Sequence, residues 1–519
     1  MLVVAAHYEL TKHYKQQTLV ARTLILSLLI GIVTILIYRI YLHPRATVPG
    51  PKWAKVTGLW RSSRYIAGKW HEDILALHDT YGPVVRIAPN EVSVVGAAPM
   101  KQIYGHGTSS KKSDWYHTWH TPGVNPPFFA ETDRKLHSLK RRRVSAAYSM
   151  TAILRYEPYI QACMDLCLSK LRAECEAGNV VDISEWTQAL VFDVVGELAY
   201  GEQLGHLRAG AADVADVRVS IASSFWIAAN LGHFWGQTRL IFDPVLGKIM
   251  KSLGVSNGVV DFIDWTKERI ANRKANPDKV ERSDMLAYFL SMKGLDGSGE
   301  ASSAEILVEA LNIVMAGADT TSAGMRASLY FIGTSPVVYQ KLQAAVDEYY
   351  EAQGLHLAIN YKQTQEIPYL QAVITEALRL SPPINFQLLR DSPAGGITID
   401  KYYIPPGCRI GMSAAAQNRD PDVYGCDRNA FRPERWLEDP AVVSRYESGN
   451  MTFGGNGPRT CIGRNIAIVE ISKFLAQFVR QFDFEFVNKR NPWTVTSAWS
   501  AHPHNMHVKL AARQMESDC

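Results

Sequence analysis

The sequence predicts a mainly helical fold with small β-sheets, of the α+β class. Apolar residues recur at helical spacing from Ser302 to about Phe331, with Glu305 completing a capping box at the start, which indicates one helix on the order of 40 Å long. A second helical pattern begins near Ile462, directly after a glycine-rich stretch. Apolar and polar residues alternate around Val508 and Leu510 instead, and this predicts a strand or hairpin.

The first feature along the chain is an apolar segment long enough to cross a membrane. Residues from Thr23 to Tyr38 are uncharged and strongly apolar, and Arg22 and Arg39 bound them. With both arginines reaching toward the membrane surface, about 20 residues suffice to span a bilayer. A signal peptide is the alternative, but no small-residue cleavage site follows the apolar run. We therefore predict an N-terminal tail over residues 1–18, a transmembrane anchor over 19–42, a proline-rich hinge over 43–55 and one large domain over 56–519.

Charge and cysteine content argue against several classes of protein. The net charge of +5 on 519 residues is mild and gives no case for binding nucleic acid. The seven cysteines are an odd number and show no disulfide framework. Cys163 and Cys167 lie one helical turn apart, but no Cys or His pair at the spacing of a structural zinc site accompanies them. His502, His504 and His507 also invite a metal interpretation, although the alternation around them favours a strand or hairpin.

The long helical pattern carries a polar pair within its apolar middle. Ala316 and Gly317 are small enough to let a flat ligand lie against the helix, and Asp319 and Thr320 follow them. Buried polar groups need a partner. One interpretation is a threonine that bonds back to its own helix and an aspartate that finds solvent. The other is an acid and alcohol pair that acts on a ligand beside the helix.

Other motifs combine charged groups at helical spacing. Glu376 and Arg379 lie at i and i+3 on one helix face, an arrangement that is usually a solvated surface pair worth a few tenths of a kcal/mol. Arg435 lies in the segment Phe431-Arg432-Pro433-Glu434-Arg435-Trp436. The basic run from Lys140 to Arg143 is typical of a solvated face, and part of it could dock an acidic protein.

The most informative stretch runs from Phe453 to Gly463 and sets Cys461 in a glycine-rich turn directly before a helical pattern. Glycines let the backbone turn tightly and approach a flat cofactor closely, and Pro458 stiffens the turn. The helix that begins near Ile462 aims its free N–H groups back at the sulfur, which favours a thiolate. A lone cysteine in such a loop is more often inert, so a ligand role depends on the other motifs.

The motifs around Thr320, Glu376, Arg435 and Cys461 follow one another along the chain as they do in the cytochrome P450 family, the haem-thiolate monooxygenases. The chain therefore resembles this family, and especially its microsomal members from filamentous fungi. The family signature places Arg two residues before the ligand Cys and Gly four before and two after it, as Arg459, Gly457 and Gly463 do for Cys461. The family's Phe lies seven residues before the Cys, whereas Phe453 lies one residue further away, which we interpret as a one-residue insertion in the turn. The resemblance implies the P450 fold, with haem b between a long distal helix and the proximal helix after the cysteine loop, and with the Cys thiolate as axial ligand.

The resemblance also implies roles for the other candidates. Thr320 would hold the water that delivers protons during oxygen activation, and Asp319 would feed that relay. Glu376, Arg379 and Arg435 would form a buried triad that locks the cysteine loop. The remaining candidates would contact the haem, with the arginines and the histidine at its propionates: His137, Arg141, Ala316, Gly317, Arg390, Phe453, Arg459 and Gly463.

The implied reaction inserts one oxygen atom from O2 into a bulky apolar or aromatic small molecule, as a tailoring step in fungal secondary metabolite biosynthesis. We find no nucleotide-binding stretch, so NADPH would act through a separate NADPH-cytochrome reductase, with cytochrome b5 as a further candidate donor. The resemblance also implies an endoplasmic reticulum membrane, with the anchor in contact with lipid and the catalytic domain in the cytosol, where thiols stay reduced. The segments expected to line the substrate pocket are 115–129, 225–234, Ala316, 384–388 and 495–499.

Two alternatives remain open from the sequence. Some haem-thiolate proteins act as isomerases or dehydratases, or rearrange peroxides, without a reductase, but those of this fold tend to lose the pair that Asp319 and Thr320 preserve. The chain could instead be a membrane-anchored haem-binding protein without turnover. The inserted residue before Cys461 is the one feature that favours this second alternative.

Overall fold

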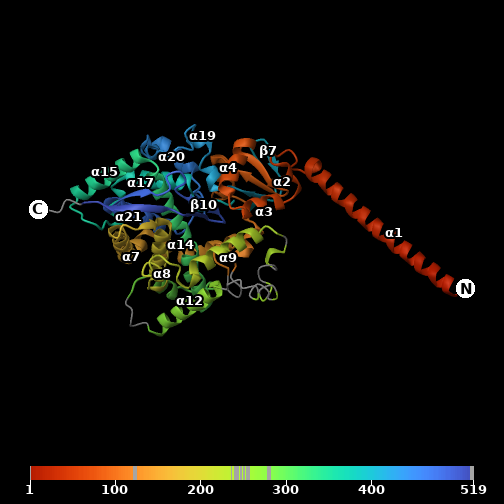
Figure 1. Cartoon of the computed structure of the whole chain (residues 1–519), viewed down its shortest axis with the longest axis horizontal. Coiled ribbons are helices and arrows are strands. Elements are labelled where there is room, and N and C mark those ends of the chain that lie inside the picture. The colour runs from red at the N-terminus through yellow and green to blue at the C-terminus, as the bar shows by residue number, and fades with distance from the viewer. Residues whose placement is uncertain are drawn as a thin grey trace.

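The architecture is organised around one long central helix, α14 (Ser303–Gly333), which crosses the middle of the molecule in green in Figure 1. The predicted capping box is present, because Ser302 Oγ accepts from the N–H of Glu305 at 3.3 Å and the Glu305 carboxylate accepts from the N–H of Ser302 at 2.9 Å. The helix predicted from Ser302 to about Phe331 is therefore confirmed. This computed structural model describes residues 2–120, 126–234, 236–238, 258–276, 282–297 and 299–514, and the single residues Asp243, Val245, Lys248 and Ser252.

The carboxylate that caps α14 also ties this helix to α6 (Arg134–Val144). Glu305 accepts from Arg143 of α6, from the N–H of Leu295 at 3.1 Å and from the Ser302 hydroxyl at 2.8 Å. Burial alone would raise the pKa of Glu305, but the Ser302 and Arg143 donors lower it to about 2. The start of α14 is thus fixed by charge-assisted hydrogen bonds as well as by its cap.

Helices surround α14 because most of its length is buried and apolar, and a helix that is apolar on most sides must be covered. One contiguous buried core includes side chains from Tyr65 to Val508. The helices that contact α14 are α8 (Ile183–Tyr200), α12 (Gly258–Ala275), α13 (Met285–Leu290), α15 (Pro336–Ala352), α17 (Pro368–Leu380) and α21 (Arg464–Gln481). Among the described residues beyond the N-terminal segment, the other α-helices are α2 (Lys52–Val56), α3 (Leu59–Ile66), α4 (Trp70–Tyr81), α5 (Ala97–Tyr104), α7 (Met150–Glu176), α9 (Val217–Leu231), α16 (Tyr361–Gln365), α18 (Ala414–Gln417), α19 (Pro421–Tyr424) and α20 (Pro440–Gly449).

The β-structure consists of small sheets at the margins of the helical body. The largest has the order β1-β2-β8-β5-β3 and is antiparallel except for the parallel pair β2 and β8. Its strands are β1 (Val84–Ala88), β2 (Glu91–Val94), β3 (Lys111–Lys112), β5 (Arg390–Asp391) and β8 (Arg409–Gly411). The others are a sheet of β4 (Val180–Asp182), β12 (His507–Ala512) and β9 (Phe482–Phe486), the hairpin of β10 (Thr494–Ser497) and β11 (Ala501–His504), and the pair β6 (Ile397–Ile399) and β7 (Tyr402–Ile404).

The C-terminal histidines lie on strands, as the alternation predicted. His502 and His504 belong to β11 and His507 to β12, and this interpretation of the sequence is confirmed. No cluster of three or more potential metal ligands occurs among the described residues. The cysteines that the structure describes are free thiols, with Cys163 and Cys167 buried within α7 and Cys426 exposed. Cys519 lies outside the described residues.

The N-terminal helix α1 (Leu2–Ile37) projects away from the rest of the molecule as an isolated rod (Figure 1). It continues into a short π-helical turn, Tyr38–Leu42. Within the described chain, Lys12–Leu42 is the one helical segment long and apolar enough to cross a membrane. Its most apolar stretch has a mean hydropathy of 2.5, and no residue of that stretch is buried in the protein. An apolar helix without any protein cover is consistent with a membrane anchor. The boundaries given above for tail, anchor, hinge and domain stay predictions.

Candidate functional site

One cavity of about 330 Å³ lies between α14 and the loop that carries Cys461. Residues far apart in the sequence meet at its wall because α14, α6, β5 and the cysteine loop all border it. The sequence-predicted residues that line it are His137, Arg141, Ala316, Gly317, Thr320, Arg390, Phe453, Arg459, Cys461 and Gly463. Asp319 and the predicted triad do not line it.

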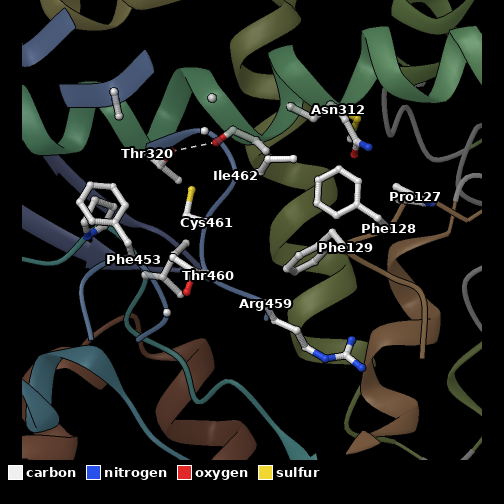
Figure 2. Close-up of a pocket in the computed structure, with 18 of the residues that line it drawn as sticks. Pro127, Phe128, Phe129, Asn312, Thr320, Phe453, Arg459, Thr460, Cys461 and Ile462 are labelled. Carbon is white, nitrogen blue, oxygen red and sulfur yellow. Dashed lines mark hydrogen bonds between the residues drawn. The ribbon is translucent and has the colours of Figure 1, made fainter. Parts of the chain in front are cut away.

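The sulfur of Cys461 points into this cavity, toward the part of α14 that carries Thr320 (Figure 2). Burial raises the pKa of the Cys461 thiol, while the N–H groups of Gly463 and Arg464 and the charge of Arg141 lower it. The helix N-terminus predicted behind the sulfur is therefore present, since α21 begins at Arg464. In the free protein the desolvation of the thiol outweighs these donors, and a cation at the sulfur would favour the thiolate.

The glycine-rich loop turns through two consecutive left-handed glycines. Gly454 and Gly455 have φ values of 83° and 76°, a region that favours glycine. The loop still closes, because the N–H of Cys461 donates to the carbonyl oxygen of Phe453 at 2.9 Å. Gly457 packs so closely that a Cβ there would lie 1.9 Å from the carbonyl oxygen of Tyr104. Phe453 lines the cavity and has the guanidinium of Arg464 at 5.4 Å from its ring centre.

Cations gather on one side of the cavity. Lys112, Arg141, Arg390 and Arg459 line it together with His137, and none of the four cations forms an ion pair with a carboxylate in the described structure. Burial lowers the pKa of His137 to about 3, with Lys112 and the three arginines adding to the effect. Burial also lowers the pKa of Arg459 to about 10, with Arg390 adding to the effect. Two buried cations, Lys112 and Arg390, and two half-buried ones, Arg141 and Arg459, without ion-paired carboxylates among the described residues fit a ligand that supplies carboxylates.

The basic run from Lys140 to Arg143 is not a solvated face, contrary to one of its two interpretations. Lys140 is buried and donates to Glu131 at 2.8 Å, Arg141 lines the cavity and Arg143 pairs with Glu305. Only Arg142 of this run is exposed. The prediction of a solvated face is wrong because α6 packs the side that carries Lys140, Arg141 and Arg143 against the cavity and α14.

The acid and alcohol pair of α14 is split between two faces of the helix. Thr320 lines the cavity and its hydroxyl donates to the carbonyl oxygen of Ala316 at 2.8 Å, the bond drawn in Figure 2. Asp319 is buried against α8, where Gln188 donates to its Oδ1 at 2.8 Å, while its Oδ2 has no partner among the described residues. Burial lowers the pKa of Arg326 and of His502, and the negative charge of Asp319 opposes this by raising both pKa values.

The structure brings Glu376, Arg379 and Arg435 together, and all three side chains are fully buried. Glu376 accepts from Arg379 at 2.7 and 2.8 Å, from Arg435 at 3.4 Å and from the indole of Trp436 at 2.9 Å. The surface-pair interpretation of Glu376 and Arg379 is wrong, because α17 turns this face inward against Pro433–Leu437. Each charge here has a charged partner, as buried charges require.

Asn418 connects this triad to the cysteine loop. Arg379 donates to the carbonyl oxygen of Asn418 at 2.7 Å. The side chain of Asn418 then accepts from the N–H of Met451 at 2.7 Å and donates to the Thr452 hydroxyl at 2.9 Å, directly before Phe453. The position of the loop that holds Cys461 is therefore set from the triad through one asparagine.

Comparison with known proteins shows which family the chain belongs to. The model of the family described as Cytochrome P450 matches residues 48–510. The chain belongs to the cytochrome P450 family. Relatives that match along almost its whole length include proteins named cytochrome P450 monooxygenase, so the protein is an oxidoreductase and a monooxygenase with the P450 α+β fold. P450 enzymes generally receive electrons from redox partner reductases.

Three of the similar proteins come from filamentous fungi. The chain is 33% identical to the cytochrome P450 monooxygenase gsfF of Penicillium aethiopicum, covering 92% of this chain and 95% of that one. It is 30% identical to the cytochrome P450 monooxygenase cicH of Emericella nidulans, covering 93% and 96%. It is 28% identical to a pisatin demethylase of Fusarium vanettenii, covering 90% of each.

The residues of the P450 cavity fit the haem-thiolate iron that the family implies. Cys461 offers one thiol to the cavity, and the unpaired cations offer donors to the propionates. Ala316 and Gly317 have little or no side chain, so the wall of α14 that borders the cavity leaves room for a flat group. These observations are independent of the family match, since they concern donor chemistry and space alone.

Sequence reasoning missed several residues of this P450 cavity. Lys112 lies on the short strand β3 and donates to the carbonyl oxygen of Phe128 at 3.2 Å. Glu470 of α21 lines the cavity with both oxygens unpartnered among the described residues, and burial raises its pKa well above the usual range. Asn312 could have been found, because it lies at i−4 from Ala316 and i−8 from Thr320 on the same helix face. Nothing in the local sequence marks Lys112 or Glu470.

Replacing Glu376 by Gln should destabilise the P450 and release its cysteine loop. The change leaves buried Arg379 without its counter-charge and Arg435 with Asp427 alone, and breaking a buried pair costs about 3–5 kcal/mol. Urea unfolding should show a loss of this size, and the purified variant should carry much less haem per chain. Glu485→Gln is the matched control, because Glu485 pairs with Lys489 on the exposed surface and should leave both readouts unchanged. Equal stability and haem content in the two variants would contradict the role of the triad.

Proposed function

We propose that this P450 inserts one oxygen atom from O2 into a bulky apolar or aromatic small molecule, as a tailoring step in fungal secondary metabolite biosynthesis. The observation that carries this proposal is the thiol of Cys461, which faces the Thr320 segment of α14 across a cavity lined largely by aromatic and apolar side chains. When bound, a haem with a thiolate ligand supplies the chemistry that cleaves the O–O bond.

The residues of the cavity would divide the work of holding that group. Cys461 would ligate the iron, and Lys112, Arg141, Arg390 and Arg459 would bind the propionates, aided by His137 as a neutral donor. Arg390 is held in place for this by Tyr116, whose hydroxyl accepts from it at 3.0 Å. Rigid support of the donors reduces the entropy lost when the group binds.

Thr320 would hold a proton donor at the cavity wall, and Asp319 would resupply it. Because Thr320 bonds to Ala316 O in the free helix, its hydroxyl oxygen remains able to accept from a water in the cavity. Asp319 is not in the cavity, so a proton from it must pass around α14, past Gln188 or His502. The unpartnered Oδ2 of Asp319 among the described residues supports a role in such a relay.

The aromatic side chains would exclude water and orient the substrate. The cavity wall includes Trp119, Phe128, Phe129, Phe225, Phe386 and Trp499, which come from segments predicted for the pocket. Residues 121–125 of the first predicted segment lie outside the described residues. A dry cavity strengthens each polar contact to the substrate and limits side reactions.

We further propose NADPH-cytochrome reductase as the electron donor, with cytochrome b5 as a second donor. The exposed cations Arg134, Lys135 and Arg142 of α6 support docking of an acidic partner. The anchor would lie in the endoplasmic reticulum membrane over residues 19–42, after a tail over 1–18. A hinge over 43–55 would lead to a cytosolic catalytic domain over 56–519.

The Cys461→Ser variant tests the ligand. Reduced wild-type protein with carbon monoxide should show the strongly red-shifted Soret band of thiolate-ligated haem, and the variant should lose it, because an alcohol is a far poorer donor than a thiolate. Cys426→Ser is the matched control, since Cys426 is an exposed free thiol. A red-shifted band that survives in Cys461→Ser would exclude Cys461 as the ligand.

Thr320→Ala should separate electron consumption from product formation. Without the Thr320 hydroxyl, no side chain holds the proton donor at the cavity wall, so proton delivery to the reacting oxygen is impaired. We therefore expect NADPH oxidation to continue with reductase while peroxide accumulates in place of product. The measurement is the ratio of peroxide to NADPH consumed. Thr334→Ala serves as control, because Thr334 makes the same back-bond, to Tyr330 O at 2.8 Å, at the exposed end of α14. An unchanged ratio in Thr320→Ala would reject the proposed proton path.

Deleting residues 2–42 should release the protein from membranes. The most apolar window of the deleted segment is not buried, and Arg39, near its end, bonds to the body through Val56 O at 2.6 Å and Arg86 at 3.1 Å. Because the helical core lies outside the deleted segment, the truncated chain should fold and bind haem. Fractionation of expressing cells should move the protein from the microsomal pellet to the supernatant or to a salt-extractable pool. Retention in a carbonate-washed pellet would show that the anchor lies elsewhere.

A further inference from the structure

Two side-chain N–H donors in the cavity wall lack a hydrogen-bond acceptor. They are Nε1 of Trp119 and Nδ2 of Asn312, both buried and both without a partner among the described residues. Native proteins satisfy almost all buried polar groups, with protein, water or ligand. Two unpaired donors on the wall of one ligand cavity therefore point to acceptors on the ligand.

Asn312 belongs to the face of α14 that the ligand meets. It precedes Ala316 by four residues and Thr320 by eight, so the three line the cavity along one helix face. Eight residues of helix correspond to about 12 Å. Figure 2 shows the amide of Asn312 facing Phe128, on the far side of the cavity from Phe453. Asn312 would thus contact the end of a substrate that is remote from Thr320.

One acceptor near Asn312 belongs to the protein, the carboxyl of Glu309. Burial raises the pKa of Glu309 to about 7, while Arg143 and the Asn312 amide act against that shift. The contact between the two side chains falls outside hydrogen-bond geometry, since Asn312 Nδ2 and Glu309 Oε2 are both unpartnered among the described residues. The Asn312 amide therefore has no acceptor among the described residues and is available to a ligand.

The direction of the Trp119 N–H is fixed by ring packing. The Trp119 ring lies 5.3 Å from Phe225, 5.1 Å from Trp499 and 5.5 Å from Phe129, centre to centre. Its neighbour Trp115 is different, because Trp115 Nε1 donates to the carbonyl oxygen of Ala229 at 3.0 Å. Of these two neighbouring indoles, the one that lines the cavity is therefore the one whose N–H has no acceptor among the described residues.

We propose that the substrate of this P450 is a planar aromatic compound that carries a carbonyl or ether oxygen, and that Trp119 and Asn312 donate hydrogen bonds to it as specificity-determining residues. This inference rests on the proposed function and narrows its substrate class. Aromatic walls favour flat ring systems through edge and stacking contacts. Two buried donors select against ligands without acceptors, because such ligands would leave both donors unpaired.

The test compares two probes of the same shape, 2-acetylnaphthalene and 2-isopropenylnaphthalene, which differ in a carbonyl oxygen against a methylene. Binding to the full-length holoenzyme is measured by equilibrium dialysis, corrected for empty detergent micelles. Wild type should prefer the ketone by about tenfold, as expected for one buried hydrogen bond. The double variant Trp119→Phe with Asn312→Leu keeps the shape of the wall and should show less than a twofold preference, with each single variant between the two.

The controls change the wall without removing a free donor. Met315→Leu alters a cavity residue that has no N–H group, and Trp115→Phe removes an indole that is already satisfied. Both should keep the wild-type preference. A double variant that still prefers the ketone, or a wild type that shows no preference or binds neither probe, overturns the inference. The carbon monoxide spectrum separates the two proposals, because a normal red-shifted band together with either result rejects the substrate class and leaves the monooxygenase intact.

Discussion

The buried carboxylate of Glu376 is the constraint on which the rest of the haem-facing structure depends. Two arginines, an indole and a backbone N–H converge on it, and all of these donors except Arg379 come from the segment 432–436, which lies far from Glu376 in the sequence. Arg379 uses its remaining N–H groups to hold carbonyl oxygens, including that of Asn418. Asn418 in turn holds the residues before the cysteine loop. Placing charge in the interior is expensive, but a fully paired cluster gives a loop without secondary structure one defined position.

The two walls of the cavity follow different rules. The cysteine side is a loop. It is fixed by the polar cluster behind it and by Gly454 and Gly455, which adopt backbone angles that other residues rarely adopt. The opposite wall is a helix, in which side-chain positions are set by the periodicity of α14. Chemistry that needs an exact thiol position and a variable substrate pocket is served by one wall of each kind.

Much of the fold and site could be predicted because the motifs combine strong local signals with a fixed order. The 302–331 helix, its capping box and the C-terminal strands are local patterns of apolar spacing and hydrogen-bonding side chains, and these were confirmed. Burial was harder to predict. Glu376 with Arg379, and Lys140 with Arg143, have the sequence pattern of exposed charges, and only tertiary packing turns them inward. Lys112 and Glu470 enter the cavity through the placement of a two-residue strand and of the second turn of α21, which no local pattern encodes.

The capping carboxylate of α14 has a consequence for how the enzyme can move. Glu305 binds Ser302 at the start of the helix and Arg143 on α6, so one side chain belongs to both elements. The same α6 presents exposed cations outward and Arg141 inward to the cavity. A displacement of α6 on contact with another protein would therefore be transmitted mechanically to the register of α14. Glu305 therefore links the position of α6 to the start of the helix that forms the facing wall of the cavity.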